Sequence, residues 1–316
     1  MALSHALLLT APRTLEWRTQ STPDLSQHEV LVRTLYSALS VGTELPLYQG
    51  TSRNPALVTY PKMTGYETYG VVEAVGEAVR DVQVGERVVT GLGHVTHAVA
   101  EASSLIRIPS GLDPRLALLT ILSNDVKKGV LKVNPQPGER VLVTGAGTIG
   151  LLTLFILRAF GVTQVDVVEP VAGRQSLAYK LGAQNVYTPE EIGALQGDTY
   201  EVGTECSSRN AAFTLLQDKL KPAGRICVLA DGNLEPLELS PQFHQKELRV
   251  VGSSDGENYP EHARWFLNLP DLSKLSALFE LIVDAEALPQ TFEALAEGEV
   301  QPIKVLVRYN ASHEAA

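Results

Sequence analysis

Hydrophobic residues in the first third of the chain form short runs that alternate in part with polar ones. Frequent Gly, Pro and Asp residues separate these runs. The strand-like segments are residues 30–36, 69–76, 87–90, 98–100 and 105–108. Many short strands joined by turn residues are typical of a small barrel or sandwich. We therefore predict a β-rich domain over residues 1–115.

The pattern then changes to helical spacing over residues 113–133, and strand-like and helix-like segments alternate beyond it. Such alternation predicts a parallel, doubly wound sheet with α/β architecture. Its sixth strand is predicted at residues 248–253, followed by a helix at 260–269. We assign residues 116–282 to this second domain. Residues 283–316 are predicted to return to the first domain through a strand at 303–308 and to end in a tail.

One segment of the second domain carries the clearest chemical signal. An aliphatic run leads into the turn Gly145-Ala146-Gly147-Thr148-Ile149-Gly150, and an apolar segment of helical length follows. Gly145 allows the tight turn, Gly147 lets a pyrophosphate approach the backbone, and Gly150 lets the helix pack on the strand. The N–H groups of the helix start, at Thr148 and Ile149, then face the phosphates. We predict a dinucleotide-binding turn at these residues.

A carboxylate indicates which dinucleotide is bound. The strand at 165–168 ends in Glu169, about twenty residues beyond the glycines, where an acidic residue binds the adenosine ribose diol. The same charge repels the 2′-phosphate of NADP. We therefore expect NAD(H), with NADP(H) less favoured. The alternative interpretation is an ordinary strand–turn–helix with a surface glutamate.

Composition excludes several classes of partner. The chain has 316 residues and a formal net charge of −10, which argues against nucleic acid and anionic membranes. Its two cysteines are too few for a disulfide framework or a four-thiolate zinc site. No apolar run reaches the length of a membrane span, and the N-terminus lacks a signal-peptide pattern. We expect a cytoplasmic protein that acts on a small molecule.

Four further motifs resemble those of the medium-chain dehydrogenase/reductase superfamily. They are Val41-Gly42-Thr43-Glu44, residues 65–72, residues 84–88 and Pro222-Ala223-Gly224-Arg225. The resemblance implies a GroES-like barrel with the substrate site and a Rossmann domain, with the cofactor in the cleft between them. Residues 40–44 and 65–67 are most similar to the zinc-lacking branch that contains bacteriochlorophyllide dehydrogenase.

The resemblance also shows what this chain lacks. Zinc-dependent members hold the catalytic metal where this chain has Val41, Tyr66 and about Ile121, none of which is a usual zinc ligand. Glu67 alone remains, and His94 and His97 are loosely spaced as replacements. We therefore expect no zinc and no other metal.

The resemblance assigns candidate roles to the remaining residues. Thr43 matches the hydroxyl that relays protons toward the cofactor ribose, and Tyr66 replaces the zinc-binding histidine, where its phenol either donates to a substrate oxygen or fills space. Glu67 is the third catalytic candidate, and burial beside a cation is its structural alternative. The additional cofactor contacts expected at strand ends and in the last strand are Cys206, Ser207, Ala230, Ser253 and Lys304.

These observations favour a zinc-independent oxidoreductase that transfers a hydride between NAD(H) and an alcohol or carbonyl compound. Two alternatives stay open, namely an NADPH-dependent reductase of quinones or activated C=C bonds, and a non-catalytic nucleotide-binding redox sensor. The apolar strand at 248–253 should form the edge of the parallel sheet. Because an open edge invites pairing, we also expect a homodimer joined across this strand.

Overall fold

The computed structural model describes residues 3–53, 59–230 and 234–310, and the chain folds into two compact units. The antiparallel unit comprises residues 1–120, 259–267 and 278–316. The parallel unit comprises residues 121–258 and 268–277. The end of the predicted tail, residues 311–316, lies outside the described residues. Each unit is built around one kind of β-sheet.

The antiparallel unit contains a three-stranded sheet in the order β2-β1-β4 and a seven-stranded sheet in the order β15-β16-β3-β5-β6-β8, with β7 paired to β3. Its strands are β1 (Leu3–Ala11), β2 (Thr14–Ser21), β3 (Glu29–Leu39), β4 (Lys62–Met63), β5 (Thr68–Val75), β6 (Arg87–Thr90), β7 (His97–Glu101), β8 (Ile106–Ile108), β15 (Phe279–Asp284) and β16 (Lys304–Arg308). All pairs are antiparallel except β15 with β16. The strands expected in the first third of the chain are present, and β1, β2 and β4 were not predicted.

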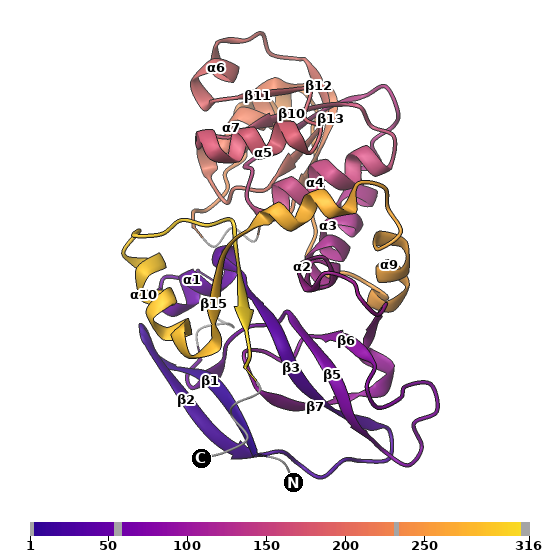
Figure 1. Ribbon diagram of the computed structural model, residues 1–316. Helices are drawn as coiled ribbons and strands as arrows, with labels where there is room; N and C mark the ends of the chain where they lie inside the picture. The colour runs from indigo at the N-terminus through magenta and orange to yellow at the C-terminus, as the bar shows by residue number, and fades with distance from the viewer. Residues whose placement is uncertain (1–2, 54–58, 231–233, 311–316) are drawn as a thin grey trace. The chain divides into compact units, whose positions relative to one another are not determined.

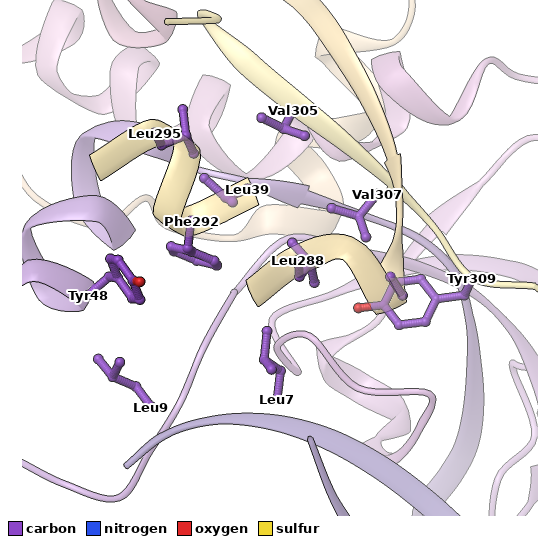
Figure 2. Packing of buried hydrophobic residues seen from close by; sticks show 11 residues of the cluster. Leu7, Leu9, Leu39, Tyr48, Leu288, Phe292, Leu295, Val305, Val307 and Tyr309 are labelled. Atoms are coloured by element: carbon purple, nitrogen blue, oxygen red, sulfur yellow. The ribbon is translucent and has the colours of Figure 1, made fainter. Parts of the chain in front are cut away.

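Helices α1 (Val41–Gln49) and α10 (Leu288–Ala296) cover one core of this unit (Figures 1 and 2). Figure 2 shows side chains from both helices converging with others from β1, β3 and β16. The rings of Tyr48 and Phe292 lie 5.3 Å apart at its centre. Leu7 and Val305 are fully buried in the same cluster, so residues from both ends of the chain close this core.

The parallel unit is a six-stranded sheet in the order β11-β10-β9-β12-β13-β14, and all of its pairs are parallel. Its strands are β9 (Arg140–Thr144), β10 (Gln164–Val168), β11 (Asn185–Tyr187), β12 (Tyr200–Glu205), β13 (Leu220–Val228) and β14 (Arg249–Gly252). Its helices are α3 (Thr120–Val133), α4 (Thr148–Ala159), α5 (Ala172–Lys180), α6 (Pro189–Ala194), α7 (Asn210–Lys219) and α8 (Pro241–Gln245). Both α4 and α7 contact the central strands β9 and β12. The predicted α/β fold is confirmed, with β14 at one edge.

The strand register brings distant segments to one edge of this sheet. Thr144 lies beside Val168 and Glu205, and Val228 lies beside Glu205 and Gly252. In an open parallel sheet, ligands bind outside these carboxyl ends. The loops that follow β9, β10, β12, β13 and β14 therefore form one candidate binding edge.

The unit boundaries differ from the sequence prediction. Residues 259–267 and 278–282 were assigned to the parallel domain, but they cluster with the antiparallel unit. Helix α9 (Tyr259–Phe266) packs against β8, with Ala263 and Phe266 buried. Helical periodicity predicts that a helix has an apolar face, but it does not tell which core receives that face. The other boundary lies at residue 120, since α2 (Pro114–Leu118) contacts β3 and β5.

Within the described ranges, no helix combines the length and apolar character needed to cross a bilayer.

Candidate functional site

The glycine-rich turn between β9 and α4 has the geometry of a phosphate-binding site. Gly145 has a φ of +87°, and its N–H donates to the Val168 carbonyl at 2.8 Å. A Cβ at Gly150 would lie 1.8 Å from the Gly145 carbonyl oxygen, so only glycine allows this helix–strand approach. Gly147 is the N-cap residue of α4 and provides no side-chain cap, and a Cβ there would have no neighbour within 4 Å. Thr148 and Ile149 begin the helix and are half-buried. The turn leaves open space directly beside a helix N-terminus, which suits an anion.

Glu169 is tied to this turn. One carboxylate oxygen accepts the N–H of Ala146 at 2.7 Å, and the other accepts the N–H of Val171 at 2.9 Å. The residue is only 3% exposed. Its carboxylate therefore holds the shape of the glycine turn, and each oxygen keeps a second lone pair for a ribose hydroxyl.

The other predicted cofactor residues of the parallel unit lie along the same edge. Cys206 and Ser207 follow β12, Ala230 follows β13 and Ser253 follows β14. The N–H of Ala230 donates to the Glu205 carbonyl at 3.0 Å, and that of Ser253 donates to the Val228 carbonyl at 3.1 Å. The register and these bonds bring all four residues to the edge that carries the glycine turn.

Sequence reasoning missed Glu205, the last residue of β12. It is fully buried, and its carboxylate accepts hydrogen bonds from the Ser207 N–H at 2.7 Å and from the Ser207 hydroxyl. Burial raises the pKa of Glu205, although these hydrogen bonds oppose the shift. A carboxylate at the end of a buried parallel strand, as at Glu169, was the signal that could have found it. Glu205 fixes the loop that carries Cys206 and Ser207.

Neither thiol has the setting of a nucleophile. Burial raises the pKa of Cys206 well above its usual range, and it raises that of Cys227 to about 11. The Cys206 Sγ lies 3.7 Å from the Thr153 hydroxyl oxygen. Since the thiolate is the reactive form, this burial argues against a nucleophilic role for either cysteine, and the cofactor contact expected of Cys206 stays a prediction.

Two hydroxyl groups meet in the antiparallel unit. Tyr66 lies in the loop before β5 and Thr43 lies in the first turn of α1. The Tyr66 hydroxyl donates to Thr43 Oγ1 across 3.5 Å. Burial, and then the nearby charge of Glu67, raise the pKa of Tyr66 well above its usual value, so the phenol stays protonated. The structure thus joins two of the three predicted catalytic residues.

The third, Glu67, forms a buried ion pair with Lys304 of β16. The two residues are 237 positions apart, and both side chains are fully buried. The structural alternative considered for Glu67, burial beside a cation, describes this contact. Lys304 was expected at the pyrophosphate, and its described partner is instead a carboxylate of its own unit. Its cofactor contact stays a prediction.

The zinc positions of the resemblance carry other contacts. Val41 packs against the core of Figure 2, and Tyr66 bonds to Thr43. His94 contacts Glu44 with 3.2 Å between Nε2 and Oε2, while His97 contacts Glu73 at 3.5 Å, so the two histidines face different carboxylates. Among the residues that the structure describes, no three His, Cys, Asp or Glu side chains gather as a metal-binding group. Val41 and Tyr66 themselves offer none of the thiolate, imidazole or carboxylate groups that tetrahedral zinc usually takes.

Comparisons with known proteins match the two units to two family models. The alcohol dehydrogenase GroES-like domain matches residues 26–109, and the zinc-binding dehydrogenase domain matches residues 148–269. An L-threonine 3-dehydrogenase from Anaeromyxobacter dehalogenans is 28% identical over 317 aligned positions, which cover 87% of this chain and 90% of that protein.

Solved structures agree with this fold. A zinc-binding dehydrogenase from Sinorhizobium meliloti bound to NADP superposes with a TM-score of 0.84 at 21% identity, covering 98% of this chain and all of the other. The 2R,3R-butanediol dehydrogenase from Bacillus subtilis gives a TM-score of 0.82 at 21% identity, covering 97% of this chain and all of the other. The GroES-like match and the dehydrogenase match, together with the similarity to L-threonine 3-dehydrogenase, show that the chain belongs to the zinc-type alcohol dehydrogenase-like medium-chain dehydrogenase/reductase superfamily of oxidoreductases.

Proposed function

We propose that the protein is a zinc-independent oxidoreductase that transfers a hydride between NAD(H) and an alcohol or carbonyl group of a small or medium-sized organic molecule. The observation that carries this proposal is the open turn at Gly147, where a helix N-terminus without a side-chain cap adjoins unfilled space. When bound there, the nicotinamide cofactor supplies or accepts the hydride.

The residues of the parallel unit fit such a cofactor. The turn from Gly145 to Gly150 suits the pyrophosphate, and the Glu169 carboxylate offers acceptors to the adenosine ribose. The fixed charge of Glu169 supports NAD(H) over NADP(H), because a 2′-phosphate beside it is repelled. Arg174 lies five residues after Glu169. If its guanidinium approached the 2′-phosphate, it would favour NADP(H) instead. The Sinorhizobium meliloti structure of the same fold is bound to NADP, so the fold alone does not decide between the two cofactors.

The hydroxyls of the antiparallel unit fit proton management at the substrate. Tyr66 keeps its proton, so its phenol can donate to a carbonyl oxygen as charge develops on it. In the structure this proton is donated to Thr43 Oγ1, so donation to the substrate requires the phenol to release that bond, and the Thr43 hydroxyl can then donate to the phenol oxygen. Glu67, held by Lys304, contributes negative charge beside the phenol without being exposed.

Zinc independence rests on the donor set. Zinc binds thiolate, imidazole and carboxylate groups, while the expected ligand positions fall on Val41, Tyr66 and about Ile121. Glu67 and His94, a carboxylate and an imidazole of the same unit, each bond to another charged or titratable side chain. Placement of the chain in the branch similar to bacteriochlorophyllide dehydrogenase is part of the same proposal.

A turnover assay tests the proposal. Protein prepared without added metal is offered NAD⁺ or NADP⁺ with a panel of secondary alcohols that includes L-threonine and 2,3-butanediol, and NADH or NADPH with aldehydes, ketones and quinones. We expect NADH-linked activity on one alcohol or carbonyl class, unchanged by a chelator, and well below one zinc per chain by elemental analysis. Activity lost to the chelator and restored by zinc would overturn zinc independence. Turnover confined to quinones or enones with NADPH would overturn the reaction class.

A further inference from the structure

A buried polar cluster lies behind the two candidate hydroxyls. Its members are Ser37, Glu44 and His94, which come from β3, α1 and the segment before β7. They are 1%, 4% and 0% exposed, respectively. Polar groups buried this deeply remain only where their hydrogen bonds are made, so the contacts of each atom show its role.

The Glu44 carboxylate joins two backbone segments. One oxygen accepts the N–H of Ser40, the N-cap residue of α1, at 2.8 Å. The other accepts the N–H of Gly65 at 2.9 Å. In a capping box, a glutamate at the third helical position accepts the N–H of the N-cap residue. Glu44 accepts that N–H from the fourth helical position, and it also accepts an N–H from the loop that contains Gly65.

Those two segments carry the candidate hydroxyls. Thr43 lies three residues after Ser40, and its N–H donates to the Ser40 carbonyl at 3.1 Å. Tyr66 directly follows Gly65. A single carboxylate therefore sets the spacing between the backbone that carries Thr43 and the backbone that carries Tyr66.

His94 supports this carboxylate from behind. Its Nε2 lies 3.2 Å from Glu44 Oε2, and its Nδ1 lies 2.9 Å from the Ser37 hydroxyl oxygen. Its own N–H donates to the Thr64 carbonyl at 2.7 Å, which holds it against the same loop. A Cβ at Gly65 would come within 2.8 Å of His94 N and 2.9 Å of its Cγ, so glycine permits this contact.

The same three residues have the atoms of a Ser–His–Glu nucleophile system, but the surroundings exclude that role. Ser37 is 1% exposed, and its hydroxyl lies 3.3 Å from the Tyr309 hydroxyl in the interior. A nucleophile must reach its substrate, whereas this serine faces a tyrosine.

We infer that Glu44, backed by His94, is a positioning residue that holds Thr43 and Tyr66 at their working separation. This inference rests on the proposed function, since it assumes that the two hydroxyls serve turnover. A displacement of about 1 Å in an active site can cost about 10²-fold in rate, which sets the expected effect.

The test is a double-mutant cycle on kcat with the substrate found by the panel. Glu44→Gln leaves one backbone N–H facing an amide NH₂ and is expected to lower kcat by roughly 10²-fold. In the Tyr66→Phe background the same change should cost no more than about twofold, because the separation of the two hydroxyls no longer matters once the phenol oxygen is gone. The affinity for NADH should not change. Glu29→Gln is the matched control, since Glu29 also accepts a backbone N–H, from Ser26 at 2.8 Å, in the same unit.

Each outcome has one meaning. Losses that multiply in the double variant, or an unchanged kcat for Glu44→Gln, overturn the positioning inference. If Tyr66→Phe and Thr43→Ala both leave kcat unchanged, the catalytic part of the proposed function fails instead.

Hydrogen exchange gives a readout that needs no substrate and no fully stable Gln variant. Glu44→Asp, one methylene shorter, should speed exchange in the peptides that contain Ser40 and Gly65, and should leave the β9 peptide unchanged. If both peptides of the Glu44→Asp variant exchange at the wild-type rate, Glu44 does not hold them, and the inference is overturned.

Discussion

The two candidate sites are built from different kinds of chemical group: backbone atoms at the glycine turn, and side chains in the antiparallel unit. At the glycine turn the groups available to the proposed cofactor are backbone atoms within six consecutive residues, and space is left for it because side chains are missing there. In the antiparallel unit the groups are side chains from segments far apart, such as Glu67 and Lys304. The first site needs one local conformation, whereas the second needs the completed fold.

Removing the buried ion pair should have the largest effect. Lys304→Met leaves the Glu67 carboxylate buried without its cation, and we expect a loss of about 3–5 kcal/mol in the free energy of unfolding, measured by urea denaturation. The double variant Lys304→Met/Glu67→Leu should recover much of this loss. Arg18→Gln, which breaks an exposed pair with Glu16, is the control and should resemble the wild type. If Lys304→Met instead weakens NADH binding and spares stability, Lys304 acts at the cofactor.

Cofactor preference is the next effect in size. A hydrogen bond to a charged acceptor contributes about 1.5–3 kcal/mol, so NADH should bind roughly ten- to a hundredfold more tightly than NADPH. Fluorescence titration with both cofactors measures the ratio, and Glu169→Gln should shrink it. Glu190→Gln, an exposed carboxylate of the same unit, should leave it unchanged. Equal or tighter NADPH binding by the wild type would contradict the role of Glu169.

Replacing single glycines of the turn by alanine separates the glycine that the fold needs from the glycine that the cofactor needs. Gly150→Ala drives a Cβ into the Gly145 carbonyl and should cost about 1–3 kcal/mol of stability. Gly147→Ala meets nothing in the fold, so it should keep the melting temperature and weaken NADH binding. Gly173→Ala in α5, which also has no neighbour within 4 Å, controls for the substitution itself. Unchanged NADH affinity in Gly147→Ala would place the pyrophosphate elsewhere.

The smallest effect concerns assembly at the edge of the parallel sheet. We propose that β14 pairs with its copy in a homodimer, because an open edge offers unpaired backbone groups. Val250→Lys should weaken the dimer by roughly tenfold, seen by light scattering across a dilution series. Leu239→Lys, at an exposed leucine outside the strand, should not. A monomeric wild type at micromolar concentration would refute the proposal.

The same contrast explains what could be read from the sequence. The glycine turn and the β9–α4 unit were predictable because a run of consecutive residues fixes them. Helix α1 was missed, since its segment contains Pro46 and lacks a clear helical pattern. The bond between Glu44 and His94 spans 50 positions, and nothing local in either segment encodes it. Glu67 could be recognised as a carboxylate that needs a cation, but its partner emerges only when β16 pairs with β3.

The core shown in Figure 2 has a consequence for how the chain is made. Its buried residues come from positions 7–48 and 285–309, so the core can close only after the ribosome has synthesised the chain through β16. The parallel unit is complete in sequence by residue 277. Because domains fold as units during synthesis, we expect the parallel sheet to form before this core, while the side chains that β1, β3 and α1 contribute to it stay exposed. We therefore expect this core to be the part of the antiparallel unit that stays exposed longest during synthesis.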